Sequence, residues 1–381
     1  MFIYAVAIVA LLVLSPHMID PTGKPVGTDF MDVWAAGKLA LAHKPAAAYD
    51  YAQHYAVQQQ ALPYAAGKKA LFYGWHYPPM FLLAAAVLAL FPYGLALGLW
   101  MAATLPAYLA AVRRIVPGRE AVMAALAFPG VFVNLGHGQN GFLTCGLLGG
   151  GLLLLETRPA VAGILFGLMS YKPQFGLLLP LALLAGRHWK AFFVAALTVV
   201  LLALVSWLVF GPETWRAFMS SASLTRNVVL EQGGTGWAKI QSIFAAMRML
   251  GGSITIAYAA QALFTLAAAV AVIWAWSKSA AIELKAAMLV VATVMATPYV
   301  LDYDLVVLAL PIAWLTALGL REGFRPWEKI TLLAVWLLPI FSRLIGTALG
   351  VPVAPFLLAW FMVLILRRTQ DKKNLLNEMG H

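Results

Sequence analysis

The sequence predicts an all-α, polytopic integral membrane protein with about twelve transmembrane helices. Of its 381 residues, 62% are hydrophobic and only 11% are charged, and the mean hydropathy is +0.84. Soluble domains carry about 25% charged residues, so a water-soluble fold is excluded. Apolar segments also recur along the whole chain with short polar turns between them. We therefore expect one integral membrane domain over residues 1–381.

The first apolar segment, Phe2 to Leu14, is interpreted as a retained span because no small-residue cleavage site precedes Pro16. A polar loop over residues 16–77 follows it. Several later segments have only about 12 to 15 residues, and such half-length helices line cavities inside a bundle. With one of the segments re-entrant, about twelve spans leave both termini inside. The later segments lie near residues 78–91, 95–112, 120–134, 140–155, 159–171, 174–185, 190–210, 256–276, 286–300, 305–319, 330–347 and 353–366.

The charge pattern predicts the orientation in the membrane. The formal net charge of +11 is concentrated in short loops and in the C-terminal tail, residues 367–381, which is a positive-inside pattern and not a nucleic-acid footprint. This pattern places the loops 16–77 and 211–253 on the extracytoplasmic side. We expect a multi-pass protein of the inner (plasma) membrane, surrounded by membrane lipids. Cys145 is the only cysteine, so an intrachain disulfide is impossible.

The first loop is expected to hold two amphipathic surface helices that carry acidic groups. Thr28 can cap the first of them, and Asp29 and Asp32 then lie in its first turn and point to the same side. A second helix is expected to start at Asp50, with Gln53 completing a capping box. Either acid could simply complement the helix dipole. The apolar face of the first helix is predicted by the spacing of Phe30, Val33, Trp34, Gly37 and Leu41.

Lys172 stands between two apolar segments, where a charge is costly and marks a candidate site. Pro173 disfavours helical geometry for Lys172, so the chain should break there. A lysine at a helix break suits an anion such as a phosphate, and Gln174 beside it could contact substrate. The alternative is a lysine that reaches the outer headgroups.

Two further breaks carry polar side chains. The segment Gly136–Asn140 offers His137, Gln139 and Asn140 as groups that could hold substrate hydroxyls, although a plain turn has the same composition. His76 and Tyr77 precede Pro78-Pro79, which set the start of the next span. His76 could bind a phosphate or could simply lie at the membrane interface.

Asp302 and Asp304 resemble the Asp-x-Asp pattern that holds a metal in nucleotide-sugar enzymes. In a helix, residues i and i+2 point apart, so sharing one ion needs an extended segment. A substrate-facing or capping role is the alternative, and we expect no metal and no cofactor. The loop 211–253 adds Arg226 and Lys239 as cations that could close over an anionic substrate, or that belong to a solvated loop.

No nucleophile triad, Walker loop or metal-ligand spacing is present. Carboxylates that face cations and amides at helix breaks suit a general base acting on a hydroxyl while the cations stabilise a phosphate leaving group. A transporter or a flippase for lipid-linked substrates is the alternative, although the repeated pair of broken segments that it predicts is absent from the sequence. A noncatalytic assembly subunit is a third reading.

The chain resembles glycosyltransferase family 87, the polyprenyl-phosphate-mannose-dependent mannosyltransferases of the GT-C superfamily, from the first loop to about residue 310. Order and spacing make the match specific. The residues that carry it are Asp29-Phe30, Trp34-Ala35-Ala36-Gly37, Ala48-Tyr49-Asp50, Tyr77-Pro78-Pro79, Gly138-Gln139-Asn140, Gly167 to Pro173, Pro298-Tyr299 and Tyr303-Asp304.

The resemblance implies a GT-C-type bundle, a polyprenyl-phosphate-linked monosaccharide donor, and a lipid or glycan acceptor on the outer face. It also implies transfer with inversion at the sugar carbon. The family's base, an aspartate in the first outer loop, maps onto Asp29. Asp32 stands where the family more often has an apolar or aromatic residue, which leaves it as the alternate base. Lys172 would take the donor phosphate, with His76, Arg226 or Lys239.

Overall fold

The structure, a computed structural model, describes residues 2–62, 73–278 and 280–379. Within these ranges the fold is all-α, as predicted, and no β-strand forms. Two isolated bridges, Ile19 with Pro25 and Ile240 with Leu301, are the extended pairings that the described residues make. The apolar segments of the sequence therefore correspond to a series of helices.

Seventeen α-helices and a set of shorter helical turns follow one another along the described chain. The α-helices are α1 (Phe2–Val13), α2 (Phe30–Leu41), α3 (Tyr51–Ala61), α4 (Leu82–Leu88), α5 (Tyr93–Ile115), α6 (Arg119–Ala127), α7 (Pro129–His137), α8 (Gly141–Leu154), α9 (Pro159–Leu168), α10 (Leu179–Ala185), α11 (Trp189–Thr225), α12 (Ile243–Met249), α13 (Ile254–Trp276), α14 (Ile282–Ala296), α15 (Ala309–Glu322), α16 (Glu328–Leu349) and α17 (Ala354–Met379). The turns used below are η2 (Pro45–Tyr49), η3 (Pro79–Phe81), η4 (Met169–Tyr171), η5 (Pro173–Phe175), η6 (Arg226–Glu231), η7 (Trp237–Lys239) and η8 (Asp302–Leu308).

Five helices in the described ranges are long and apolar enough to cross a membrane, or six if the bent pair of α6 and α7 is one span. The expected count of about twelve spans is not confirmed. The segment near 120–134 is broken, because α6 and α7 meet at an angle of 54°. Pro129 at the start of α7 removes a backbone donor, which explains the break.

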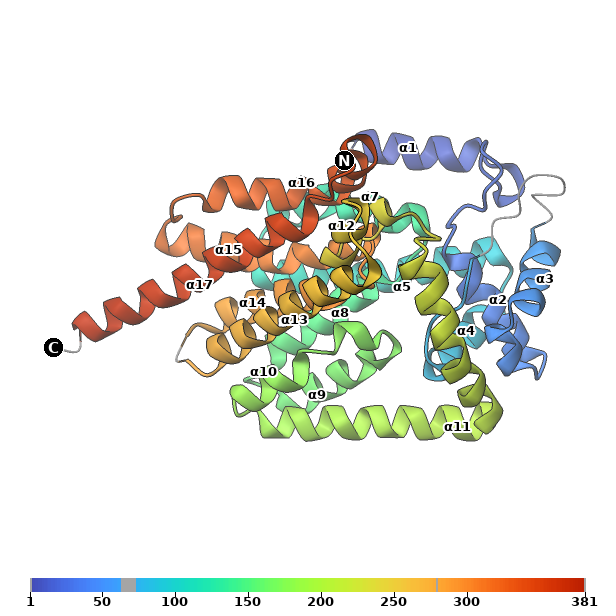
Figure 1. Ribbon diagram of the computed structural model, residues 1–381, viewed down its shortest axis with the longest axis horizontal. Helices are drawn as coiled ribbons and strands as arrows, with labels where there is room; N and C mark the ends of the chain where they lie inside the picture. Colours follow the sequence, from blue (N-terminus) through green and yellow to red (C-terminus); the bar gives the residue numbers. More distant parts are fainter. Residues whose placement is uncertain (1, 63–72, 279, 380–381) are drawn as a thin grey trace.

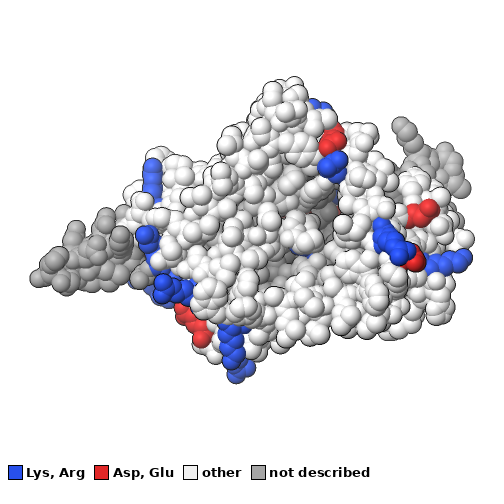
Figure 2. Space-filling model, turned by 60° about the horizontal axis from the view of Figure 1, so that its bottom comes forward, with Lys and Arg blue, Asp and Glu red and all other residues white. Residues whose placement is uncertain are grey.

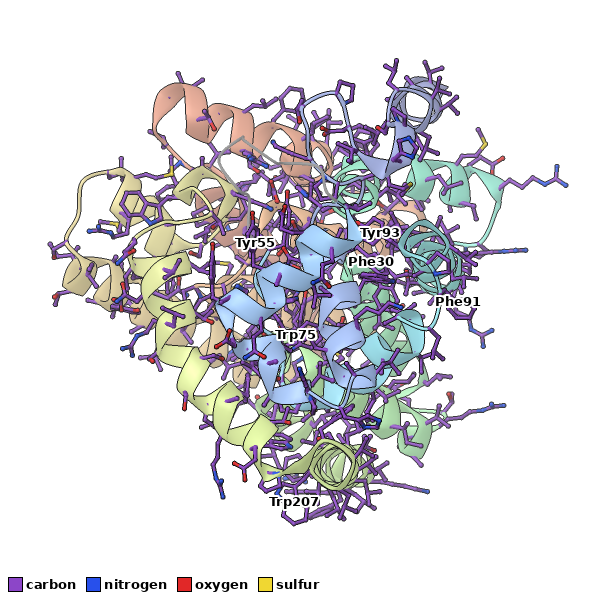
Figure 3. All side chains as sticks on the ribbon, turned by 90° about the vertical axis from the view of Figure 1, so that its right-hand side faces the viewer. Phe30, Tyr55, Trp75, Phe91, Tyr93 and Trp207 are labelled. Atoms are coloured by element: carbon purple, nitrogen blue, oxygen red, sulfur yellow. The ribbon has the colours of Figure 1, made fainter. Side chains whose placement is uncertain are left out.

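Exposed apolar side chains on α11 indicate a lipid-facing surface. Phe193, Val200 and Leu208 are each more than half exposed, although they lie on a helix with no charged residue between Lys190 and Glu213. Water would penalise this surface, whereas hydrocarbon would not. Trp207 projects from the same helix at the lower edge of Figure 3. By contrast, residues 286–296 of α14 are all buried, so this helix lies in the centre of the bundle.

The two ends of the molecule differ in the loops that they carry. Figure 1 places the connections α10–α11, α13–α14 and α15–α16 and the end of α17 towards the left, and it places α2 and α3 at the right. Figure 2 shows charged side chains mainly towards the two ends, with a wide uncharged band between them. These connections and the helix ends next to them carry basic residues, among them Arg187, Lys285 and Arg321, and the positive-inside pattern assigns them to the inner side. They share one end of the molecule, opposite the helices of the first loop (Figure 1).

The segment 211–253, expected as a long loop, is largely helical. Gly211 has a φ of 77°, and at this residue α11 turns and continues to Thr225. Figure 1 shows the two arms of α11 at a wide angle. After η6, the chain passes through η7, and this turn carries Lys239. The bend brings a segment distant in sequence back over the first loop.

The helix α2 is buried on nearly all sides, so the prediction of a surface helix with one apolar face is wrong. Nine of its twelve residues are buried. It packs on α4 so closely that a Cβ on Gly37 would lie 2.0 Å from the carbonyl oxygen of Ala85. Figure 3 views this end, where Phe30 of α2 and Tyr93 of α5 lie together with ring centroids 5.7 Å apart.

The two predicted helix caps in the first loop have different outcomes. Thr28 does not cap α2. Asp29 occupies the N-cap position instead, without a side-chain capping bond. The prediction for the second helix is confirmed at its start, because the Asp50 carboxylate accepts a hydrogen bond of 2.9 Å from the backbone N–H of Gln53.

Candidate active site

Asp29 lies at the start of α2 and is held against the break between α7 and α8. Its backbone N–H donates to the carbonyl oxygen of His137 at 3.0 Å. Its carboxylate accepts a hydrogen bond of 3.2 Å from Gln139 Nε2, and Lys239 Nζ lies 3.4 Å from the same oxygen. His137 Nδ1 is 3.8 Å from the other oxygen. Residues from three distant parts of the chain therefore converge on this carboxylate.

These contacts favour the ionised form of Asp29. Burial alone would raise the pKa of the carboxyl group, but Lys239, His137 and the hydrogen bonds from Gln139 and Thr28 together hold this pKa below its ordinary value. The side chain is still 14% exposed, so a ligand could reach it. Asp29 is thus a carboxylate that stays charged and accessible, as a general base requires.

Lys172 lies at the helix break that Pro173 predicts. Its backbone has φ −132° and ψ 70°, between the short turns η4 and η5. The ammonium group forms a buried ion pair with Asp304 and donates to Asn140 Oδ1 at 2.9 Å. The break therefore delivers a cation into the protein interior and not to the headgroups, where a lysine could have escaped burial.

A chain of hydrogen bonds connects the two charged centres. Gln139 donates to Asp29 through Nε2 and accepts at 3.2 Å from the Tyr77 hydroxyl through Oε1. That hydroxyl accepts at 2.7 Å from Asn140 Nδ2, and Asn140 Oδ1 accepts from Lys172. Gly138, with a φ of 64°, ends α7 and points the two amides to this side. Both amides thus contact the hydroxyl group of Tyr77, and their predicted role in holding substrate hydroxyls stays a prediction.

Tyr303 joins the two lysines, although the sequence reasoning did not select it. Lys239 Nζ lies 5.1 Å and Lys172 Nζ lies 5.5 Å from the centroid of its ring. Cations near an aromatic ring are stabilised by its quadrupole. The ring of Tyr303, which belongs to η8, thus lies close to both ammonium groups.

Asp302 and Asp304 point to different partners, which argues against a shared ion. Asp304 pairs with Lys172, whereas Asp302 Oδ2 accepts from Arg343 Nη1 at 3.1 Å. Within the described ranges, no three His, Cys, Asp or Glu side chains are grouped to hold a metal. Arg343 was missed by the sequence analysis, although a single arginine in the apolar segment 330–347 was a signal for it.

Three of the expected site residues lie outside this network of contacts. His76 is exposed, and its Nδ1 lies 2.9 Å from the hydroxyl of Thr225. The guanidinium group of Arg226 pairs with Glu231 at 3.4 Å and is 60% exposed. Gln174 is partly exposed and makes no hydrogen bond to the network within the described part of the chain. Of the four predicted phosphate-binding residues, Lys172 and Lys239 are the two that the fold brings together.

Asp32, the alternate base, has surroundings unlike those of Asp29. It is buried, and its Oδ1 accepts no hydrogen bond from a described residue. Burial, and then the charge of Asp29, raise its pKa well above the ordinary value. The surroundings of Asp32 thus favour the protonated form of its carboxyl group, whereas those of Asp29 favour the ionised form.

Fold and site together define a helical membrane protein whose polar site brings an ionised aspartate and two lysines together at helix breaks. Residues 75–298, more than half of the chain, match the family model of glycosyltransferase family 87. The chain belongs to this family, and it is a membrane glycosyltransferase. The matched segment includes Lys172 and Lys239, whereas Asp29 precedes it. Neither a curated protein nor a solved structure matches the sequence.

Proposed function

We propose that the protein transfers a sugar, mannose by family expectation, from a polyprenyl phosphate to a hydroxyl group of a lipid or glycan acceptor. The reaction inverts the anomeric carbon. The observation that carries this proposal is the position of an ionised Asp29 beside Lys239, with a hydrogen-bonded connection to Lys172. One group can accept a proton while cations a short distance away receive a phosphate.

Asp29 is the general base. Its carboxylate takes the proton of the acceptor hydroxyl as the oxygen attacks the anomeric carbon. The bond from that carbon to the phosphate oxygen breaks, and the phosphate leaves with the electron pair. Gln139 and Thr28 hold the carboxylate in place through their hydrogen bonds. Positioned proton transfer of this kind contributes about 10²–10⁴-fold to a rate.

Lys172 and Lys239 stabilise the leaving phosphate. Lys172 uses two of its three N–H donors on Asn140 and Asp304, which leaves one for a phosphate oxygen. The ammonium group of Lys239 moves partly away from Asp29 and contacts the phosphate as negative charge develops on it. Both ammonium groups face Tyr303, so they need little reorganisation when the charge forms.

The active site faces the extracytoplasmic side of the inner membrane. Asp29 belongs to the first loop, whose helices lie opposite the end with the basic loops (Figure 1). The lipid donor then reaches the site from the outer leaflet. Binding of polyprenyl phosphate through its single phosphate needs no metal ion, because the lysines supply the positive charge.

The test uses purified protein in lipid vesicles with radiolabelled polyprenyl-phosphate-mannose and a membrane-lipid extract as acceptor. Asp29→Asn should lower transfer at least about 100-fold, because it removes the base. Asp50→Asn is the matched control, since Asn is an equally good helix cap in the same loop. We expect this control to transfer at the wild-type rate.

Near-wild-type transfer by a folded Asp29→Asn variant would rule out Asp29 as the base. Absence of transfer by the wild-type protein from mannose, glucose and arabinose donors, each linked to polyprenyl phosphate, would refute the proposed donor class. Transfer from a nucleotide sugar instead would show that the donor is not a polyprenyl phosphate, and the role proposed for the two lysines would fail with it.

A further inference from the structure

The Asp32 carboxyl group has a buried oxygen, Oδ1, that has no hydrogen-bond partner among the described residues. Asp32 lies three residues after Asp29 on α2, so both side chains project from the same side of the helix. It is only 6% exposed, and Oδ1 receives no hydrogen bond from the described residues. His54 Nε2 of α3 lies 3.2 Å from the backbone carbonyl oxygen of Asp32. A buried polar atom of this kind normally has a partner.

Both lysines of the site lower the pKa of Asp32, but among the described residues neither forms an ion pair with it. Lys239 contacts Asp29, and Lys172 is paired with Asp304. The charges of Asp29, Lys172 and Lys239 all act on Asp32, and the ionisable groups that face it also include Tyr77 ahead of η3. A buried, unpaired carboxylate beside another carboxylate is costly, and protonation removes the cost. These surroundings therefore favour the uncharged form of the carboxyl group.

An uncharged carboxyl group offers one O–H donor and one carbonyl acceptor. A sugar hydroxyl has the complementary pair, an acceptor oxygen and a donor O–H. Asp32 is the neighbour of Asp29 on one side of α2, because residues three apart lie on the same face of a helix. The unpartnered Oδ1 is thus available to a sugar held between the base and the lysines.

We propose that Asp32 binds a hydroxyl group of the transferred sugar through its buried Oδ1 and takes no part in proton abstraction. This inference rests on the proposed function. The two aspartates of α2 then have separate tasks, since Asp29 accepts the proton and Asp32 recognises the sugar.

The first test compares Asp32→Asn and Asp32→Leu with donors that lack single sugar hydroxyls. Asp32→Asn keeps a donor and an acceptor, so its kcat/KM should fall less than that of Asp32→Leu. Asp32→Leu should lose about 3- to 10-fold with the complete donor, the cost of one neutral hydrogen bond. With the one deoxy donor that lacks the bound hydroxyl, Asp32→Leu should match wild type. Met31→Leu, at a neighbouring buried position, is the control and should treat all donors as wild type does.

The inference is overturned if folded Asp32→Asn is as inactive as Asp29→Asn, because Asp32 would then be a base. It is also overturned if Asp32→Leu shows the same loss with every deoxy donor, since such a loss reflects damage to the fold. Thermal unfolding of each variant identifies a protein that has not folded. If Asp32→Leu does not fold, the comparison of Asp32→Asn with Asp29→Asn still tests the inference, because asparagine has nearly the shape of aspartate.

The second test measures the carboxyl group directly and does not depend on transfer. The infrared spectrum of the wild-type protein in lipid at neutral pH should contain the carbonyl band of a protonated acid. That band should persist in Asp29→Asn and disappear in Asp32→Asn. Its absence from the wild type overturns the inference. If the band is present but no lipid-linked donor is used, the proposed function fails while the uncharged state of Asp32 stands.

Discussion

Replacement of Lys172 by methionine separates the structural and chemical roles of the buried ion pair. The side chains of Lys172 and Asp304 are 5% and 2% exposed. Removal of one partner from a buried pair costs about 3–5 kcal/mol, because the other charge is left without compensation. We expect Lys172→Met to lower the free energy of unfolding by this amount. Thermal unfolding in detergent, followed by tryptophan fluorescence, measures the loss.

A second substitution returns most of that stability. In Lys172→Met with Asp304→Asn the unpaired charge is gone, and the amide oxygen can still accept from the backbone N–H of Leu301, as the carboxylate does at 3.0 Å. If Lys172 also binds the donor phosphate, the restored double variant should still transfer sugar at least about 100-fold more slowly than wild type. Wild-type transfer by the double variant would show that the lysine only stabilises the fold. Unchanged stability of Lys172→Met would refute the reasoning from burial.

Three other substitutions or reagents test the packing and the electrostatics of the site. Gly37→Ala should destabilise the protein by about 1–3 kcal/mol because its Cβ meets the backbone of α4, whereas Gly98→Ala, with open space around it, should be neutral or slightly stabilising in the same melting assay. Lys239→Gln removes the cation that lowers the pKa of Asp29, so the acid limb of a kcat/KM profile should move to higher pH; an unmoved limb would mean that another group sets it. Cys145 is buried, so a maleimide should label it only after unfolding, and rapid labelling of the native protein would contradict the packing of α8.

The first loop shows how far a sequence pattern predicts a buried helix. The spacing of Phe30, Val33 and Trp34 correctly indicated a helix, but it also suggested a surface position with one apolar side. Small residues make up much of the remaining surface of α2, and Gly37 among them lets the backbone of α4 pack directly against it. Burial on that side depends on the partner helix, so periodicity within α2 could not reveal it.

The pairing of charges also needed the tertiary structure. The sequence marked Lys172 as a residue whose charge is unfavourable to bury, because apolar residues flank it on both sides. Asp304, the residue that neutralises this charge, lies 132 positions away in the sequence. Arg226 and Lys239 come from one segment and have the same charge, yet only Lys239 reaches Asp29, because the bend at Gly211 decides where that segment folds back.

The sequence by itself determined the membrane class and the breaks at Gly136–Asn140 and at Lys172-Pro173, because these follow from local hydropathy and from the backbone chemistry of proline and glycine. Only the tertiary structure decided which break faces which, and it gave Asp29 and Asp32 different surroundings. Two carboxyl groups three residues apart are equivalent as a pattern. They differ because the protonation state of a buried acid depends on the cations and hydrogen-bond donors that distant segments bring to it.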